Sequence, residues 1–308
     1  FLLSAALLFS LAACASVHPK KNVETWKFTD SCGRTVDLPV EVEHIVPSGA
    51  LAQTVLYTLC PDKLQSLSAA LTREQYIDKK YWNLPVTGQF YGGGATVNYE
   101  EIIRAAPDVI IDIGEAKEHI AADMDELQEQ TGIPTIFVEA SLANMAGAYE
   151  TLGKITGETA QAAACAAYVR KTLSEAAAFS AQIPKNERKR VLYAQGEYGT
   201  EVLGVGSVHA EVLDYVAAEN VAKLSTVASQ GGNEVSMEQI YLWDPQVLIL
   251  SPEANYDEIF KDPVWANVRA VKDGAVYEVP AGPFNWMDRP PSVQRVLAVK
   301  WLGNLLYP

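Results

Sequence analysis

The sequence contains few of the residues on which metal sites and nucleophilic catalysis depend. Its 308 residues include four cysteines and four histidines, and no two cysteines have the C-x-x-C spacing of a redox or zinc site. The histidines include no pair one helical turn apart and no H-E-x-x-H motif. We therefore expect no metal site and no cofactor. His209 is the best placed for a site assembled from distant residues, but we interpret it as a structural histidine.

Nucleotide-binding motifs are also absent. The glycines at 92–94 are not followed by the lysine of a phosphate-binding loop. The segment 204–207, Gly-Val-Gly-Ser, lacks the third glycine of a dinucleotide fingerprint and is not a G-x-S-x-G nucleophile elbow. We expect Ser207 to cap a helix over 208–217 rather than to act as a nucleophile. The protein is therefore not expected to be an enzyme.

Positive charge is scarce. Lys and Arg together number 24 against 38 Asp and Glu, which gives a net charge of −14. This balance argues against a nucleic-acid partner, because such binding depends on cationic side chains that neutralise phosphates. It also argues against electrostatic attachment to an anionic membrane. An anionic ligand is still compatible with it, because a small pocket can be locally positive on an acidic protein.

The apolar run at the N-terminus is too short to span a membrane. Residues 1–13 carry no charge, and a spanning helix needs about 20 apolar residues. The run fits the apolar core of a secretory signal. Its last residues and Cys14, Leu-Ala-Ala-Cys, resemble the lipobox of bacterial lipoproteins, in which the cysteine becomes the lipidated first residue. A plain secretory signal is the alternative.

We accordingly interpret 1–13 as a signal segment and 14–24 as a lipidated tether. The mature protein is expected to be exported and held at the outer face of the cytoplasmic membrane or in the periplasm, touching the membrane only through its anchor. Of the other cysteines, Cys32 and Cys60 can pair in an oxidising compartment, and the sequence leaves that open. Cys165 lies in an Ala-rich stretch and is expected to be a buried apolar residue.

Two segments of the chain repeat one pattern. Residues 98–112 align with 236–250 without a gap, and the matched pairs are Glu100 with Glu238, Ile102 with Ile240, Pro107 with Pro245, Val109 with Val247 and Ile111 with Ile249. Each copy opens with helix-capping residues, Asn98 with Glu101 and Ser236 with Gln239. A short helix ended by proline and an apolar run of strand length follow in both. The repeat predicts two α/β lobes of similar build.

The remaining segments fit this organisation. Strands are expected within 43–49, 131–139, 190–196 and 275–280, with a helix over 50–59, and strands that alternate with helices form parallel sheets. Residues 159–181 lack Gly and Pro and predict one helix of about 35 Å. The predicted fold is α/β: two Rossmann-like lobes with parallel sheets, joined by one long rigid interdomain helix. Its parts are an N-terminal lobe at 25–157, the linking helix at 158–183 and a C-terminal lobe at 184–308.

In open α/β sheets, ligands bind beyond the carboxyl ends of the strands. That rule selects Ser48, Gln89, Tyr91, Gly92, Glu115, Tyr198, Phe284, Asn285, Trp286 and Arg289 as candidate ligand-binding residues. The guanidinium of Arg289 suits a carboxylate, an oxyanion or a propionate. The alternative is that Trp286 packs beneath the sheet and Arg289 pairs with Asp288 or Glu197. We expect Ser292 to cap the final helix, over 293–306.

Over nearly all of its mature length the chain resembles the substrate-binding lipoproteins of ABC importers for iron–siderophore complexes, haem and cobalamin. The resemblance rests on the segments 30–39, 98–103, 106–111 and 262–277, on the single Ala-rich helix, and on the closing helix. It implies a monomer with two lobes that captures a small ligand and delivers it to an ABC permease dimer with its ATPase. Glu100 and Glu238 match the glutamates with which the family docks on the permease. They could also simply complement a helix dipole.

The resemblance leaves the ligand open. We expect an iron complex, a siderophore or haem, whose organic shell stacks on aromatic rings while Arg289 meets its charge. Cobalamin and the oxyanions molybdate and tungstate are the alternatives on the same fold. A nitrogenase-like two-domain enzyme is a distant alternative, because the cysteines lack the spacing that a cluster needs.

Overall fold

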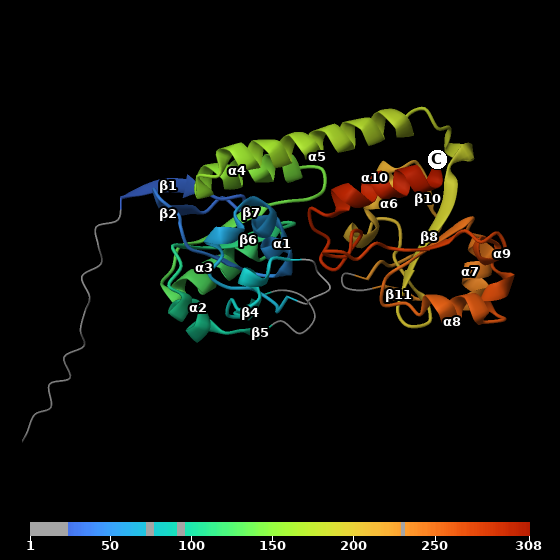
Figure 1. The fold of residues 1–308 in the computed structure, drawn as a ribbon, viewed down its shortest axis with the longest axis horizontal. Coiled ribbons are helices and arrows are strands. Elements are labelled where there is room, and N and C mark those ends of the chain that lie inside the picture. The colour runs from blue at the N-terminus through green and yellow to red at the C-terminus, as the bar shows by residue number, and fades with distance from the viewer. Residues whose placement is uncertain (1–23, 72–76, 91–95, 229–231) are drawn as a thin grey trace, which may run out of the picture.

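Two α/β lobes lie side by side, and one long helix runs along both of them (Figure 1). The computed structural model describes residues 24–71, 77–90, 96–228 and 232–308. The predicted signal segment at 1–13 and Cys14 lie outside these residues. Within them, no helix is both long enough and apolar enough to cross a membrane.

The first lobe is built on a three-stranded parallel sheet in the order β3-β6-β7. All six residues of β6 (Val109–Gly114) are buried, as expected for a strand covered on both faces. The other elements of this lobe are β1 (Thr25–Thr29), β2 (Thr35–Pro39), β3 (Ile45–Pro47), α1 (Ala50–Leu59), η1 (Pro61–Lys63), η3 (Lys79–Tyr81), β4 (Gly88–Gln89), β5 (Thr96–Val97), α2 (Tyr99–Ala105), α3 (Ile120–Thr131), β7 (Thr135–Glu139) and α4 (Met145–Thr156). The predicted strands and the helix over 50–59 are confirmed.

The second lobe has a mixed sheet in the order β11-β9-β8-β12-β13, with β10 also paired to β8. The parallel strands are β8 (Lys189–Gln195), β10 (Ala218–Asn220), β12 (Val247–Leu250) and β13 (Val276–Glu278). The short strands β9 (Glu201–Val202) and β11 (Asn233–Glu234) are antiparallel. The expectation of a wholly parallel sheet was wrong at this edge, because the chain turns back after β8 through Gly196 and Gly199, which both have positive φ.

The helices of the second lobe are mostly short. They are η4 (Lys185–Glu187), η5 (Val208–Ala210), α6 (Val212–Tyr215), α7 (Met237–Trp243), α8 (Tyr256–Lys261), η6 (Trp265–Asn267), α9 (Arg269–Lys272) and α10 (Arg295–Leu306). Ser207 does accept a hydrogen bond from the His209 amide, as a cap should. The predicted helix over 208–217 was wrong in extent, because it is divided into η5 and α6.

The internal repeat is present in the backbone. Its two helices, α2 and α7, have seven residues each, and Asn98 and Ser236 accept the amide hydrogen of the residue three positions on. Both helices end on a left-handed residue other than glycine, Ala106 with φ 46° and Asp244 with φ 41°. A proline follows each, and a proline disfavours the right-handed helical region for the residue before it. The same local rule therefore ends both copies.

The linking helix α5 (Thr159–Ser180) has 22 residues and is about 33 Å long. It contacts α1 and α4 in the first lobe and α6 and α10 in the second. One continuous apolar core extends through these helices from lobe to lobe. The predicted helix over 159–181 is confirmed, and it joins the two lobes into a single body.

The three cysteines of the described residues are free thiols. Cys32 donates to the carboxylate of Asp30 at 3.1 Å, within the turn of the β1–β2 hairpin. Cys60 is buried at the end of α1, and burial raises the pKa of its thiol to about 12. The pairing of Cys32 with Cys60, which the sequence allowed, does not occur in this structure.

The contact between α4 and α5 depends on a glycine. A Cβ placed on Gly153 would lie 2.4 Å from the Cβ of Ala162, so the helices would have to separate. We predict that Gly153→Ala lowers the free energy of unfolding by about 1–3 kcal/mol. Gly147→Ala in the same helix meets no atom within 4 Å and should be neutral or stabilise by up to about 1 kcal/mol. Urea unfolding of both variants is the measurement, and equal stabilities would contradict the packing argument.

Candidate ligand-binding site

The carboxyl ends of the parallel strands of both lobes meet at one interface. In the first lobe β3 and β6 end at Pro47 and Gly114, and in the second β8 and β12 end at Gln195 and Leu250. The lobes touch there. Ser292 of the second lobe donates its hydroxyl hydrogen to the Leu51 carbonyl at 3.2 Å, and the Leu142 amide of the first lobe hydrogen-bonds to the Glu211 carboxylate. Ligands of open α/β sheets bind at such strand ends.

A buried hydroxyl–carboxylate pair forms the first-lobe side of this interface. Ser48 follows β3 and donates to Asp112, which lies within β6 and is 6% exposed. Burial raises the pKa of Asp112, against the hydrogen bond from Ser48 and the charge of Lys117. The pKa of Lys117 is lowered by partial desolvation. Asp112 is thus held out of water where β6 ends, while the nearby Lys117 is exposed.

Two further first-lobe candidates lie beside this pair. A Cβ added to Gly49 would lie 3.7 Å from the Cβ of Gln89, so Gln89 borders the loop that leaves β3. The Phe90 amide donates to the Ser48 carbonyl at 3.0 Å, which ties the β4 segment to the same loop. Glu115 follows β6 and is exposed. Tyr91 and Gly92 fall in the segment 91–95, outside the described residues.

On the second-lobe side, the segment 282–292 folds around a buried carboxylate. Asp288 is 1% exposed, and it accepts hydrogen bonds from the Arg289 amide at 2.7 Å and from the Nδ1 side of His209. The Asn285 side-chain oxygen in turn accepts from the amides of Met287 and Asp288. His209 is therefore placed by a carboxylate, in agreement with its interpretation as a structural histidine.

Arg289 is the exception in this well-bonded segment. Its φ of 54° lies in the left-handed region that residues other than glycine rarely adopt. Its guanidinium is 42% exposed and lies 3.8 Å from Glu253 and 4.0 Å from Asp288, longer than direct hydrogen bonds. Of the partners considered from the sequence, Asp288 is thus near, and Glu253 takes the place expected for Glu197. The guanidinium is loosely held at the strand ends.

A second cation lies deeper at the interface and is firmly held. Arg295 is 1% exposed and donates to Glu211 at 2.6 Å and to the Val208 carbonyl at 3.1 Å. Burial lowers the pKa of Arg295 and raises that of Glu211, while Glu115 of the opposite lobe adds a second negative charge. Since its hydrogen bonds go to Ser292, Val208 and Glu211 of its own lobe, Arg295 is a structural residue rather than a free anion site.

Three buried polar side chains lack good partners in this lobe, and sequence reasoning missed two of them, Tyr193 and Gln195. Tyr193 and Gln195 are fully buried on one face of β8, and Asn285 is 9% exposed. The hydroxyl of Tyr193, both amide atoms of Gln195 and the amide nitrogen of Asn285 make no well-formed hydrogen bond. Asn285 was among the candidates, whereas Tyr193 and Gln195 carried only the weak signal of alternation within 190–196.

The aromatic candidates are placed unequally. Tyr198 is 71% exposed at the turn after β8, while Phe284 is half-buried. Trp286 packs against the main core and donates its indole hydrogen to the Gly282 carbonyl at 3.0 Å, which matches the alternative that it supports the sheet.

The expectation that Ser292 caps the last helix was wrong. That helix, α10, begins at Arg295, and the Ser292 hydroxyl is used for the contact with Leu51.

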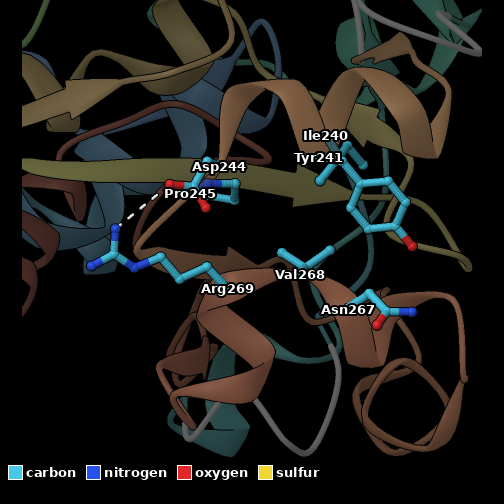
Figure 2. A pocket seen from close by; sticks show the side chains of 7 residues that line it. All are labelled: Ile240, Tyr241, Asp244, Pro245, Asn267, Val268 and Arg269. Atoms are coloured by element: carbon cyan, nitrogen blue, oxygen red, sulfur yellow. Dashed lines mark ion pairs between the residues drawn. The ribbon is translucent and has the colours of Figure 1, made fainter.

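A separate cavity of about 320 Å³ lies away from the strand ends (Figure 2). Side chains of α7, η6 and α9 line it, and the ion pair between Arg269 and Asp244, at 3.5 Å, stands at one side. Because Asp244 and Pro245 precede β12, this cavity is at the amino end of that strand.

In the parts of the chain that the structure describes, no group of three or more His, Cys, Asp or Glu side chains could hold a metal ion.

Comparison with known proteins identifies the family. A family profile described as "Periplasmic binding protein" matches residues 73–283. The chain belongs to the periplasmic binding protein family. The structure is similar to an ABC transporter solute-binding protein from Sulfurospirillum deleyianum, with 31% identity, a TM-score of 0.84, and coverage of 92% of this chain and 88% of that one. A periplasmic solute-binding protein from Veillonella parvula matches at 26% identity, with a TM-score of 0.73 over 92% and 87% of the two chains.

Curated relatives of this periplasmic binding protein include two with named ligands. The molybdate-binding protein MolA of Haemophilus influenzae is 29% identical over 41% of this chain and 35% of its own length. The Fe(3+)-citrate-binding protein YfmC of Bacillus subtilis is 24% identical over 59% of this chain and 56% of its own. The matches thus span between about a third and just over half of these relatives. Proteins of this family act outside the cytoplasm in transport, and the two-lobed α/β fold predicted from the sequence is confirmed.

We predict a pH-dependent effect of Asp112. Because burial raises its pKa above the ordinary value of 3.8, the folded periplasmic binding protein holds this proton more tightly than the unfolded chain. The free energy of unfolding therefore falls as pH rises from the pKa of the unfolded chain toward the higher pKa of the folded protein. Asp112→Asn cannot ionise, so its stability relative to the wild type should increase as pH rises above 3.8.

Urea unfolding at several pH values measures this effect. Asp125→Asn is a matched control in the same lobe, because Asp125 is exposed and pairs with Arg34 at 2.7 Å. That variant should lose no more than about 1 kcal/mol. An Asp112→Asn variant less stable than the wild type at every pH would mean that the ionised carboxylate is favourable in the fold.

Proposed function

We propose that this protein is the solute-binding component of an ABC importer, and that it captures an anionic iron complex between its lobes. The observation that carries the proposal is Arg289, whose guanidinium is half-exposed on a left-handed backbone at the carboxyl ends of the strands. A loosely paired guanidinium offers planar donors to a carboxylate or oxyanion without first breaking a short hydrogen bond. The similarity to the ferric-citrate-binding protein of Bacillus subtilis supports an iron carboxylate as the ligand.

Two carboxylates near Arg289 compete with an anionic ligand for its guanidinium. Glu253 and Asp288 lie within 4.0 Å of the guanidinium, and both have other partners, Ser251 for Glu253 and His209 for Asp288. An incoming anion must therefore replace two long ion pairs, which it can do with shorter, charge-assisted hydrogen bonds. The aromatic candidates Phe284 and Tyr198 would border the organic part of a chelate.

Molybdate or tungstate is the second candidate for the ligand. The matched segment of the Haemophilus influenzae molybdate-binding protein supports it. The buried donors beside Arg289 also suit an oxyanion, because such a ligand needs several hydrogen-bond donors at short range. Both candidates are compact, oxygen-rich anions that carry a metal, and Arg289 serves both.

We propose that Glu100 and Glu238 dock the protein on a permease dimer that works with an ATPase. Each glutamate is exposed and lies in the first turn of its helix, α2 or α7, and each was singled out by the repeat. Two similar helices on two similar lobes suit the two subunits of a dimer. The protein would then act as a monomer with one glutamate for each subunit.

Export and anchoring are part of the same proposal. Residues 1–13 would be removed as a signal and Cys14 lipidated, with the tether to residue 24 joining the anchor to the lobes. Mass spectrometry of the N-terminal peptide of the protein from its source tests this. A diacylglyceryl-modified Cys14 is expected, and an unmodified cysteine would overturn the anchor.

We predict that Arg289→Gln weakens binding of ferric citrate at least tenfold, because a charge-assisted contact to the anion is lost. Arg269→Gln is the matched control, because it removes the same charge from a half-exposed arginine beside the distal cavity. Isothermal titration calorimetry of both variants with ferric citrate and with molybdate is the measurement. Equal weakening by the two variants would mean that Arg289 acts only through its long-range charge and does not contact the ligand.

We predict that the double variant Glu100→Arg/Glu238→Arg abolishes uptake while leaving ligand affinity unchanged. Reversed charge at both sites opposes the cationic groups that would pair with the glutamates on the permease. Uptake into cells that lack the native protein, together with calorimetry on the purified variant, makes the comparison. A variant with Glu101 and Gln239 changed to Arg serves as the control on the same helices. Normal uptake by the first variant would sink the docking proposal.

A further inference from the structure

Polar groups without good partners gather where β8 ends. The Tyr193 hydroxyl is fully buried and faces the Asn285 amide, yet neither group makes a well-formed hydrogen bond. The charges of Asp288, Glu253 and Arg289 act on Tyr193, and Asn285 accepts a hydrogen bond from the Asp288 amide. Gln195 adds a third such side chain two residues along the same strand face. This concentration is unusual, because buried polar groups in native proteins are nearly always paired.

The fold itself does not require these donors. Tyr193 belongs to the main apolar core, and a phenylalanine would fill the same volume without an unpaired hydroxyl. Asn285 needs its side-chain oxygen for the amides of Met287 and Asp288, whereas its amide nitrogen has only a poorly formed contact with the Tyr193 hydroxyl. Buried donors that the protein's own groups satisfy so poorly point to a partner that is absent.

The chemistry of the group favours an anionic oxygen. The Tyr193 hydroxyl and the Asn285 NH₂ can both donate, and Arg289 supplies a full positive charge beside them. The two nearby carboxylates already have donors, because Asp288 is bonded to His209 and to the Arg289 amide, and Glu253 to Ser251. Their remaining oxygens lie 3.8–4.0 Å from Arg289, so an anionic ligand would have to displace these two long ion pairs.

We propose that Tyr193 and Asn285 are ligand-binding residues, which together with Arg289 hold one oxygen-bearing group of a compact metal-containing anion. The shared chemistry is an oxyanion or a metal-bound carboxylate, and molybdate and ferric citrate are its two sources. This proposal rests on the proposed function and deepens it, because it assigns the ligand's charged end to the second lobe. Tyr193 and Asn285 bind the ligand, and Gln195 lies on the same face of β8 as Tyr193.

The test exploits opposite effects of one substitution on stability and on affinity. Tyr193→Phe removes only the hydroxyl, so it should raise the midpoint of thermal unfolding by about 1–3 °C. The same change should weaken binding of the preferred anion by about 10- to 100-fold, because a hydrogen bond to a charged ligand is lost. The purified protein is titrated calorimetrically with sodium molybdate and, separately, with ferric citrate.

Tyr149→Phe is the matched control. Tyr149 is equally buried, but its hydroxyl is bonded to Thr58 within the first lobe. Losing that hydroxyl should lower the unfolding midpoint and leave affinity unchanged. A second variant, Asn285→Asp, keeps the side-chain oxygen that binds the Met287 amide, replaces the donor with a negative charge, and should also weaken anion binding.

Each outcome decides something. A Tyr193→Phe variant that is more stable and weaker in binding supports the proposal, and the anion that binds the wild type identifies the source. A variant that is more stable with unchanged affinity overturns the proposal and leaves the proposed function standing, since the hydroxyl then serves packing or a buried water. A wild type that binds neither anion, measured against a folded control, overturns both the ligand class and this assignment.

Discussion

The packing of α5 against helices of both lobes fixes how the two sheets face each other. α5 contacts α4 in one lobe and α10 in the other, and the close approach to α4 depends on a glycine opposite Ala162. Direct contacts from Ser292 to Leu51 and from Leu142 to Glu211 then join the lobes at the strand ends. Because of this arrangement, the carboxyl ends of parallel strands from both lobes meet, and the candidate site exists only as long as they do.

Burial at those strand ends is unfavourable for polar groups, and only some of the buried groups have partners that offset it. Asp112 and Arg295 are buried with partners, a hydrogen bond from Ser48 for Asp112 and the opposite charge of Glu211 for Arg295. Tyr193 and Asn285 are buried without good partners. Arg289 has a left-handed backbone, and its guanidinium makes only long ion pairs. A stable fold has no need for unpaired donors and a loosely paired arginine at one place, whereas a binding site does.

Much of the fold could be predicted from the sequence because local rules determine it. Proline and helix-capping residues ended and began the two repeat helices where expected, and the Gly- and Pro-free stretch formed α5. The site was harder, because its residues meet only through tertiary contacts. Of the alternative partners of Arg289, Asp288 lies near it, but Glu253 takes the place of Glu197. Ser292 reached across to Leu51 instead of capping α10. Asp112 could have been noticed, since a charge in a buried apolar strand, aligned with Leu250 in the repeat, is a local anomaly.

A metal-containing anion bound between the lobes, with its charge at Arg289, can be located by its metal. Anomalous diffraction from crystals grown with ferric citrate or with molybdate is the decisive measurement, because the metal itself gives the signal. We expect one strong anomalous peak between the strand ends, bordered by the loop at Gly49 on one side and by Arg289 on the other. A peak confined to the distal cavity lined by Tyr241 and Arg269, or bound metal with no contact to the segment 282–292, would contradict it.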